Sequence, residues 1–184
     1  MNRLSALIVG LSIVAVGCGG ESSPTAPSAG TTTTSTFTVP LSSGNEVPAI
    51  VNADATGSGT AVIALTVAKD NAGNITSATA NFQITVTGFA AGTTVTDAHI
   101  HNGVAGGNAG VYVGTTLASG ELALANGGGS ITKNGINVPS DRAAAILSNP
   151  AGHYFNVHTA LNPAGAIRGQ LGAPVVTQGT AAPY

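Results

Sequence analysis

The feature of this sequence that most constrains its fold is the repeated alternation of apolar and polar residues over short segments. Between residues 61 and 67, every second residue is an alanine, isoleucine, leucine or valine that would share one face of a strand. A period of two is typical of a β-strand with one buried face, because successive side chains point to opposite faces. The pattern returns at residues 82–86 after a turn at 70–73, so these two segments are expected to form a hairpin.

Glycine and asparagine turns divide the rest of the chain into further short segments of this kind. Residues 140–148 favour a helix instead, because Pro139 and Ser140 give a start signal and the alanine-rich run ends before Pro150. Strands and helices do not alternate as they do around parallel sheets. We therefore expect an all-β fold, an antiparallel Greek-key β-sandwich or barrel with one short helix. The other strands are expected at residues 93–101, 111–118, 121–125, 130–132, 153–159 and 166–171.

The first residues indicate export and a lipid anchor. Residues 1–17 have a positive start and an apolar run that is too short to span a bilayer comfortably. The residues before Cys18, the only cysteine, resemble the lipobox of bacterial lipoproteins, in which this cysteine becomes the lipidated first residue of the mature protein. Ala15 stands where leucine is commoner. Two or more acyl chains anchor a protein stably. A plain signal peptide with a released product, or an uncleaved anchor, is the alternative.

Low-complexity segments flank the expected domain. Residues 18–35 are rich in glycine, serine, proline and threonine without an apolar period, which indicates a disordered tether. Residues 173–184 lack obvious core residues and are expected to form a flexible tail, so the folded domain is expected at residues 36–172. Together these segments predict a protein of the cell envelope, extracytoplasmic on the outer membrane or cell surface, that contacts the membrane only through its lipid.

The composition argues against several classes of function. Charged residues make up only 7% of the chain, with five lysines and arginines in total, so a basic surface for nucleic acid is not expected. The sequence contains neither a Gly-x-Ser-x-Gly nucleophile elbow nor a phosphate-binding Gly-Lys-Ser/Thr motif. Its carboxylates stand mostly beside turn residues, and no pair for glycoside hydrolysis is located. No catalytic residue is assigned, and a binding or structural module with a protein or other cell-envelope partner is favoured.

Three histidines form the main chemical pattern of the sequence. His99 and His101 are two residues apart on an expected strand, so they point to the same face. The residues between and before them are apolar, which places both histidines on the face away from the core. His158 has the same relation to its apolar neighbours in the strand expected at 153–159, whereas His153 falls on the core face. If the two strands are neighbours, three imidazoles converge.

Three imidazoles on rigid strands predict a site for a divalent transition metal, with copper or zinc as the favoured ion. Asp97 or Glu46 would complete the ligand set or fix the tautomer of a histidine. The alternative interpretation needs no metal. In it, the histidines hydrogen-bond to one another, to Asp97 or to the main chain under a loop.

Arg168 is the only charged residue that follows His158. One interpretation is that it steers an anion toward the histidine face. The favoured interpretation is a structural ion pair with Glu46, bidentate and partly buried, because charges are scarce in this chain.

Four short motifs together resemble the chordin-type domain, called CHRD, in order over about residues 37–172. In animals this domain occurs in chordin, an extracellular antagonist of bone morphogenetic proteins, and its bacterial versions are secreted or lipid-anchored. The resemblance therefore implies location and fold more than an activity. Ala166 stands where the family usually has glutamate before Ile-Arg-Gly. The motifs are Leu41-x-x-x-x-Glu46-Val47-Pro48, Ala98-His99-Ile100-His101-Asn102-Gly103, Tyr154-x-Asn156-Val157-His158-Thr159 and Pro163-x-Gly165-x-Ile167-Arg168-Gly169-Gln170-Leu171.

The sequence is also similar, more weakly, to copper-zinc superoxide dismutase, an antiparallel Greek-key sandwich. That similarity implies copper ligation by His99, His101 and His158 and an anion-guiding role for Arg168. Residues 102–133 contain no histidine, so the bridging ligand and the zinc site of that family are missing. A copper-dependent redox enzyme or copper-handling protein is therefore an alternative function, and a purely adhesive domain without a ligand is a third.

Overall fold

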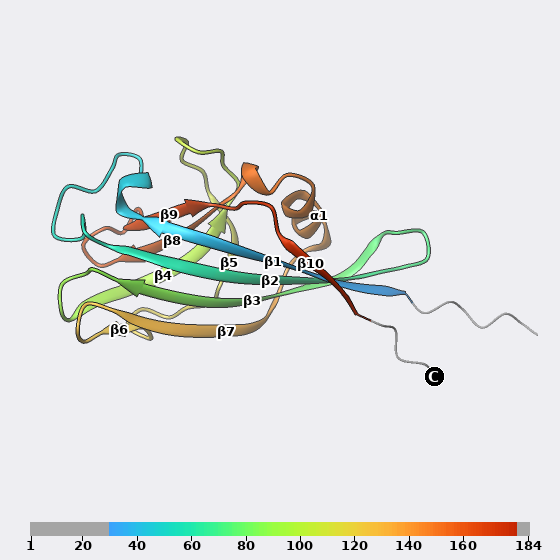
Figure 1. Cartoon of the computed structure of the whole chain (residues 1–184), viewed down its shortest axis with the longest axis horizontal. Coiled ribbons are helices and arrows are strands. Elements are labelled where there is room, and N and C mark those ends of the chain that lie inside the picture. The colour runs from blue at the N-terminus through green and yellow to red at the C-terminus, as the bar shows by residue number, and fades with distance from the viewer. Residues whose placement is uncertain (1–29, 180–184) are drawn as a thin grey trace, which may run out of the picture.

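The computed structural model describes residues 30–179, which form an all-β domain with one short α-helix (Figure 1). The helix, α1, spans Ser140–Ser148, and two 3-10 turns, η1 and η2, span Ser43–Asn45 and Pro150–Gly152. The strands are β1 (Thr31–Ser42), β2 (Ser58–Lys69), β3 (Ile75–Thr87), β4 (Thr93–His101), β5 (Val111–Gly114), β6 (Ala123–Leu124), β7 (Gly129–Asn137), β8 (Tyr154–Thr159), β9 (Ile167–Gln170) and β10 (Val175–Gly179).

The strands form one antiparallel sheet in the order β5-β4-β8-β9-β1-β2-β3-β7, with β10 paired to β1 and β6 paired to β4. The sheet curls over its own inner face. Phe82 on β3 stacks against Phe155 on β8 with ring centroids 5.9 Å apart, although the two strands are far apart in the sheet order. Both rings are fully buried, so the two halves of the sheet share one core. The all-β class, the antiparallel pairing and the helix at 140–148 are confirmed.

The alternation read from the sequence sets which residues enter this core. On β2, the four apolar residues at alternate positions from Ala61 to Val67 are at most 2% exposed, and their partners on β3 are buried as well. Burial of such side chains stabilises the fold by roughly 25 cal/mol per Å² of apolar surface. The helix closes one side of the core with Ala143 and Ile146. The alternate residues of β4, Ala98 and Ile100, belong to the same core.

β7 and β5 differ in extent from the sequence-based prediction. β7 is longer than residues 130–132 and continues through Asn134 and Gly135. Gly135 has a φ of 66° and lies beside a register shift, so the strand absorbs it as an irregularity while it remains paired with β3. β5 ends at Gly114, shortly before Thr116, whose φ of 59° leaves the extended region. These extents depend on pairing partners, which local periodicity does not reveal.

The paired strands extend beyond the expected domain boundaries. β1 begins at Thr31, and β10 pairs with its first half from Thr32 opposite Gly179 to Thr36 opposite Val175. The tether and tail expected at 18–35 and 173–184 therefore include strand residues, which corrects those boundaries. The threonine run lacks an apolar period, but β-branched residues favour strands and the ladder hydrogen bonds need only backbone groups.

The predicted signal peptide at residues 1–17 and the predicted lipidation site Cys18 lie outside the described residues. So do the first part of the tether and the last part of the tail. Within residues 30–179, no helix has the length and apolar character needed to cross a membrane.

Candidate metal centre

Two neighbouring strands bring the three predicted histidines together. β4 and β8 are paired with His99 opposite Asn156, His101 opposite Tyr154 and Asp97 opposite His158. Residues opposite each other in an antiparallel pair share a face of the sheet. Arg168 on β9 lies opposite Asn156 and so joins the same face. We call this set of residues on β4, β8 and β9 the histidine face.

The three histidines lie close enough to share one ion. Each ring offers one nitrogen, and these nitrogens all lie within 4.8 Å of one another. His99 Nδ1 is 2.9 Å from His101 Nε2, and the ring centroids of His99 and His158 are 4.4 Å apart. Nitrogen ligands bind zinc at roughly 2.0–2.1 Å, so three nitrogens around one ion are separated by a little more than 3 Å. Small side-chain adjustments would bring this cluster to that spacing.

The histidine face points away from the apolar core, as the alternation predicted, but it is not open to solvent. Each of the three histidines is only 6% exposed. The segment 103–110 covers it and is held at several points. The Ala109 carbonyl accepts a hydrogen bond from His101 Nδ1 (2.8 Å), the Ala109 amide donates to the Tyr154 hydroxyl (3.2 Å), and the Gly103 carbonyl accepts from Gln170 Nε2 (2.8 Å).

The main chain fixes the tautomers of two histidines. His101 Nδ1 faces the Ala109 carbonyl at 2.8 Å, and His158 Nδ1 faces the Pro163 carbonyl at 2.9 Å. A carbonyl oxygen only accepts, so each Nδ1 carries the proton and each Nε2 of a neutral ring keeps its lone pair. The Nε2 of His158 is buried without a partner among the described residues. This pattern, in which the distal nitrogen donates to a carbonyl, is typical of metal-binding histidines.

The two interpretations of the cluster differ in the tautomer of His99. In the metal-free interpretation, His99 Nδ1 carries the proton and donates to the lone pair of His101 Nε2. In the metal interpretation, the proton is on His99 Nε2, which lies 3.5 Å from Asp97 Oδ2, and Nδ1 is free to bind the ion. Both tautomers fit the coordinates, so the geometry accommodates either state.

Burial favours the neutral form of His99 and His101. It lowers the pKa of the His99 imidazole to about 4, an effect that His158 and His101 increase and that the carboxylate of Asp97 opposes. Burial also lowers the pKa of His101, while its hydrogen bond to the Ala109 carbonyl opposes the shift. Neutral imidazole is the form that binds a metal, so His99 and His101 are in the competent state at neutral pH.

The two predicted carboxylates have different positions. The side chain of Asp97 is 48% exposed and lies at the edge of the cluster, where it can orient His99. Its Oδ1 accepts a hydrogen bond from the amide of Ala98 at 2.7 Å. Glu46 is not part of the histidine cluster and lies beside Arg168 instead.

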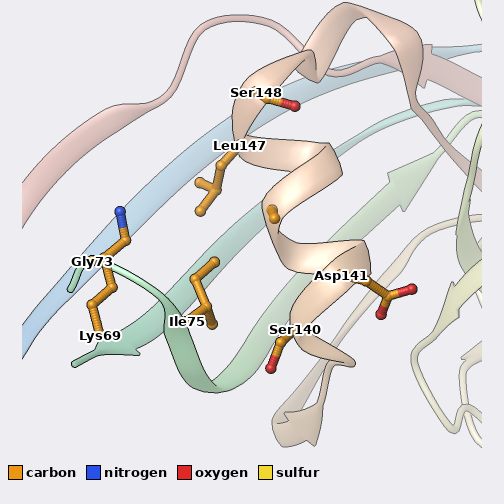
Figure 2. A pocket seen from close by; sticks show the side chains of 8 residues that line it. Lys69, Gly73, Ile75, Ser140, Asp141, Leu147 and Ser148 are labelled. Atoms are coloured by element: carbon orange, nitrogen blue, oxygen red, sulfur yellow. The ribbon is translucent and has the colours of Figure 1, made fainter.

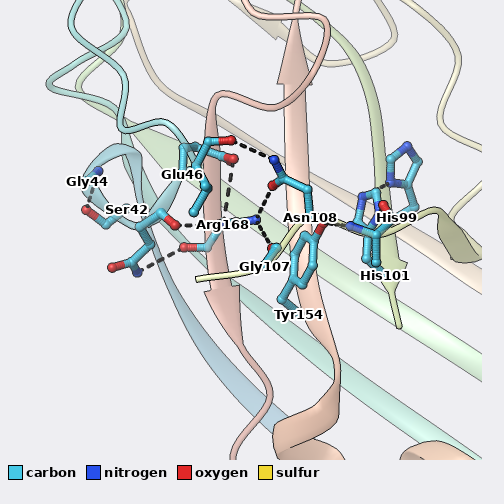
Figure 3. Close-up of polar contacts among 12 residues, drawn as sticks. Ser42, Gly44, Glu46, His99, His101, Gly107, Asn108, Tyr154 and Arg168 are labelled. Carbon is cyan, nitrogen blue, oxygen red and sulfur yellow. Dashed lines mark hydrogen bonds and ion pairs between the residues drawn. The ribbon is translucent and has the colours of Figure 1, made fainter. Parts of the chain in front are cut away.

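The predicted pairing of Arg168 with Glu46 is present, but it is neither bidentate nor partly exposed (Figure 3). Arg168 Nε is 3.8 Å from Glu46 Oε2, and both side chains are 5% exposed. The guanidinium makes its hydrogen bonds elsewhere. Nε donates to the Asn45 carbonyl (2.6 Å), and Nη1 donates to the Gly107 carbonyl (2.9 Å) and Asn108 Oδ1 (3.0 Å). The two loops offer nearer acceptors than the carboxylate does, so Arg168 joins η1 to the covering segment.

Tyr154 is a part of the site to which sequence reasoning assigned no role. Its ring is stacked on His101 with centroids 4.5 Å apart and an angle of 8°, and Arg168 lies over its ring at 4.7 Å. The stack therefore connects the histidines to the Arg168 region (Figure 3). The available signal was its alternation with Asn156 and His158 on the same face. His153 lies outside the cluster, with Nδ1 donating to the Asn149 carbonyl at 3.0 Å.

A large hollow elsewhere on the domain does not coincide with this chemistry. A hollow of about 510 Å³ lies between the β2–β3 hairpin and α1, and none of its lining residues belongs to the histidine cluster. Figure 2 shows Lys69 and Asp141 on opposite sides of it, with the apolar side chains of Ile75 and Leu147 between them. No group of metal-binding residues among residues 30–179 lines it.

Comparison with known families identifies the fold. The family model of the CHRD domain matches residues 37–171, which is most of the chain. The chain belongs to the CHRD domain family. The three histidines, Glu46 and Arg168 all lie inside the matched CHRD region. No curated protein and no solved structure shows significant similarity to the chain.

Proposed function

We propose that this CHRD protein is a lipid-anchored, extracytoplasmic binding or structural module whose three histidines hold one copper or zinc ion. The observation that carries the metal site is the convergence of three ring nitrogens within 4.8 Å on a buried face. Two of these rings donate their distal N–H to main-chain carbonyls, which leaves the inward nitrogens with lone pairs. When bound, the ion would cross-link β4 to β8.

The donor set supports copper or zinc over a hard cation. Three neutral imidazoles suit copper and zinc, whereas magnesium and calcium prefer several oxygen ligands. Asp97 would act on the ion through His99, because its Oδ2 lies 3.5 Å from His99 Nε2 and would orient the ring. His101 would be kept in place by the ring of Tyr154.

The envelope location is supported by the sequence of residues 1–35, with a short apolar leader and a single cysteine at its end. Acylation of Cys18 would anchor the chain, and the residues between Cys18 and Thr31 would separate the CHRD domain from the membrane. Labelling of growing cells with a radioactive fatty acid tests this proposal. Incorporation that disappears in Cys18→Ser supports it, and equal labelling of both proteins overturns it.

Metal retention is the direct test of the histidine site. The purified full chain is stripped with chelator, incubated with copper or zinc, desalted and examined by elemental analysis. We expect about one ion per chain, and loss of most of it in His101→Ala. His153→Ala is a matched control, since His153 is equally buried but outside the cluster. A folded wild-type chain without metal, or a His101→Ala chain that retains as much as wild type, would contradict the proposal.

A further inference from the structure

The carboxyl group of Glu46 is a buried acid without a hydrogen-bond donor. Its side chain is 5% exposed, and among the described residues no group donates a hydrogen bond to either oxygen. Oε1 has no partner at all, and Oε2 has only Arg168 Nε at 3.8 Å, which is beyond hydrogen-bond distance. A buried polar atom left without a partner costs about 1–3 kcal/mol, and more if it is charged. The arrangement therefore needs an explanation.

Arg168 does not supply one. Its Nε and Nη1 are committed to the Asn45 carbonyl, the Gly107 carbonyl and the amide oxygen of Asn108. Nη2 is buried without a partner among the described residues, and no hydrogen bond joins it to Glu46, so the guanidinium acts on Glu46 as a nearby charge. Burial raises the pKa of Glu46 to about 7, and the positive charge of Arg168 opposes this shift. The carboxyl group is consequently poised to accept a donor or a cation from outside the chain.

Glu46 borders a small cavity with apolar walls. The cavity measures about 210 Å³, and its walls include Val47, Pro48, Leu161 and Pro163. Val47 and Leu161 are 38% and 53% exposed, so the mouth of the cavity presents apolar surface to solvent. Pockets for drug-sized ligands measure about 300–1,000 Å³, so this cavity suits a group of side-chain size.

Gly165 packs directly against Glu46 and Asn156. It lines the same cavity, and a Cβ placed on it would lie 2.9 Å from Glu46 Oε1 and 2.5 Å from Asn156 Nδ2. Its φ of 133° is also one that other residues rarely adopt. Oε1 lies beside Gly165, a residue of the cavity wall, and near the amide of Asn156, whose Oδ1 is likewise buried without a partner among the described residues.

We propose that Glu46 and this cavity form a binding site for a primary alkylammonium group, such as a lysine side chain or a small aliphatic amine. The ammonium group supplies the N–H donors that the carboxyl group lacks. The hydrocarbon stem covers the apolar surface of Val47 and Leu161. This site is separate from the histidine cluster and does not require a metal.

The first experiment titrates the full chain with n-butylammonium chloride and, separately, with n-butanol, and follows binding by calorimetry or chemical-shift changes. The two probes have similar shapes, so the comparison isolates the charge. We expect butylammonium to bind at least about tenfold more tightly than butanol. N-acetyl-lysinamide then identifies the source of the amine. Binding as tight as that of butylammonium indicates a lysine side chain as the natural ligand, and its exclusion indicates a small amine.

Two further comparisons test the residues. Glu46→Gln keeps the shape of the side chain and should reduce butylammonium affinity by at least about tenfold. The control is Glu121→Gln, which changes an exposed carboxylate paired with Lys133 and should leave affinity unchanged. If Glu46→Gln fails to fold, the wild-type chain still provides a test. Affinity should rise from methylammonium to butylammonium by roughly threefold per methylene, because the stem contacts apolar walls.

Three results would overturn the proposal: no binding of butylammonium by the folded wild-type chain, equal binding of butanol, or unchanged binding in a folded Glu46→Gln protein. The outcome is independent of the metal test. His101→Ala should lose metal and retain the amine site, whereas Glu46→Gln should do the reverse.

Discussion

The two polar faces of the sheet start from the same sequence pattern and end in different environments. On β3, the residues that alternate with the core are threonines and other uncharged polar residues, and they are exposed. The corresponding residues of β2 include Val62 and Ala64 and are half-buried. On β4 and β8, the corresponding residues are the histidines and Asn156, and they are buried. The difference is the cover, since residues 103–110 and the Pro163 turn close over the second face. Alternation decides which face of the sheet a residue joins, and the covering loops decide whether that face is shielded from solvent.

The largest effect on stability is expected from the replacement of Arg168, which holds the covering segment 103–110 in place. Arg168→Ala leaves the acceptors at Asn45, Gly107 and Asn108 unpaired and removes the only nearby charge from Glu46. We expect a loss of about 3–5 kcal/mol in the free energy of unfolding. Lys133→Ala breaks an exposed ion pair with Glu121 and should cost less than about 1 kcal/mol. Urea denaturation measures both, and similar losses would mean that the cover does not isolate the histidine face.

A smaller effect should appear in the pH dependence of stability, through Glu46. The pKa of Glu46 is raised to about 7 in the folded chain, above its ordinary value of 4.5. Above pH 4.5 the unfolded chain loses this proton more readily than the folded chain, so the contribution of Glu46 to stability is present at low pH and is lost as pH rises toward 7. Allowing for solvent screening, Glu46→Gln should gain roughly 1–2 kcal/mol over wild type between pH 4.5 and 8.

The difference in stability between wild type and Glu46→Gln isolates the effect of Glu46, because both proteins contain His99. The contribution of His99 changes with pH in the opposite direction. The pKa of His99 is lowered, so its contribution is lost as pH falls from 6.5 toward 4. An exposed acid provides the contrast. Hydrogen bonds from Asn74 lower the pKa of Asp70, so the stability difference between wild type and Asp70→Asn should be constant from pH 4.5 to 8 and should shrink only at more acidic pH. A constant difference between wild type and Glu46→Gln from pH 4.5 to 8 would show that Glu46 is not held in a dry environment.

The cover itself should respond to the loss of one hydrogen bond. Tyr154→Phe keeps the stack on His101 but removes the hydroxyl that accepts from the Ala109 amide at 3.2 Å. We expect a loss of about 1 kcal/mol and faster hydrogen exchange at the amide of Ala109. Tyr112→Phe is the control, because the Tyr112 hydroxyl makes no hydrogen bond among the described residues, and it should be nearly neutral. Equal rates of hydrogen exchange at the Ala109 amide in wild type and Tyr154→Phe would show that this hydrogen bond does not hold the covering segment in place.

The smallest effect is expected on the uncovered face. Thr85→Val replaces an exposed hydroxyl on β3 with a methyl group of similar size and should change stability by no more than about 0.5 kcal/mol. The measurement is again urea denaturation. A loss above about 1 kcal/mol would indicate that this face is also engaged, and the contrast between the two faces would fail.

The sequence by itself determined the features that depend on local order. Alternation placed His99, His101 and His158 on one face of their strands, and the alanine-rich run between two prolines placed the helix at residues 140–148. The four CHRD motifs predicted the family over nearly the same residues that the family model matches. These features follow from the periods of strand and helix, which neighbouring residues express without the rest of the chain.

Only the tertiary structure decided which of these residues are buried and what they contact. Arg168 donates to main-chain carbonyls of two distant loops instead of pairing bidentately with Glu46, and the threonine run at residues 31–35 pairs with β10 from the other end of the chain. The dry environment that lowers the pKa of His99 comes from the segment at 103–110 and from β8, not from its own strand. Burial and partnership depend on groups far apart in sequence, and a local pattern carries no information about them.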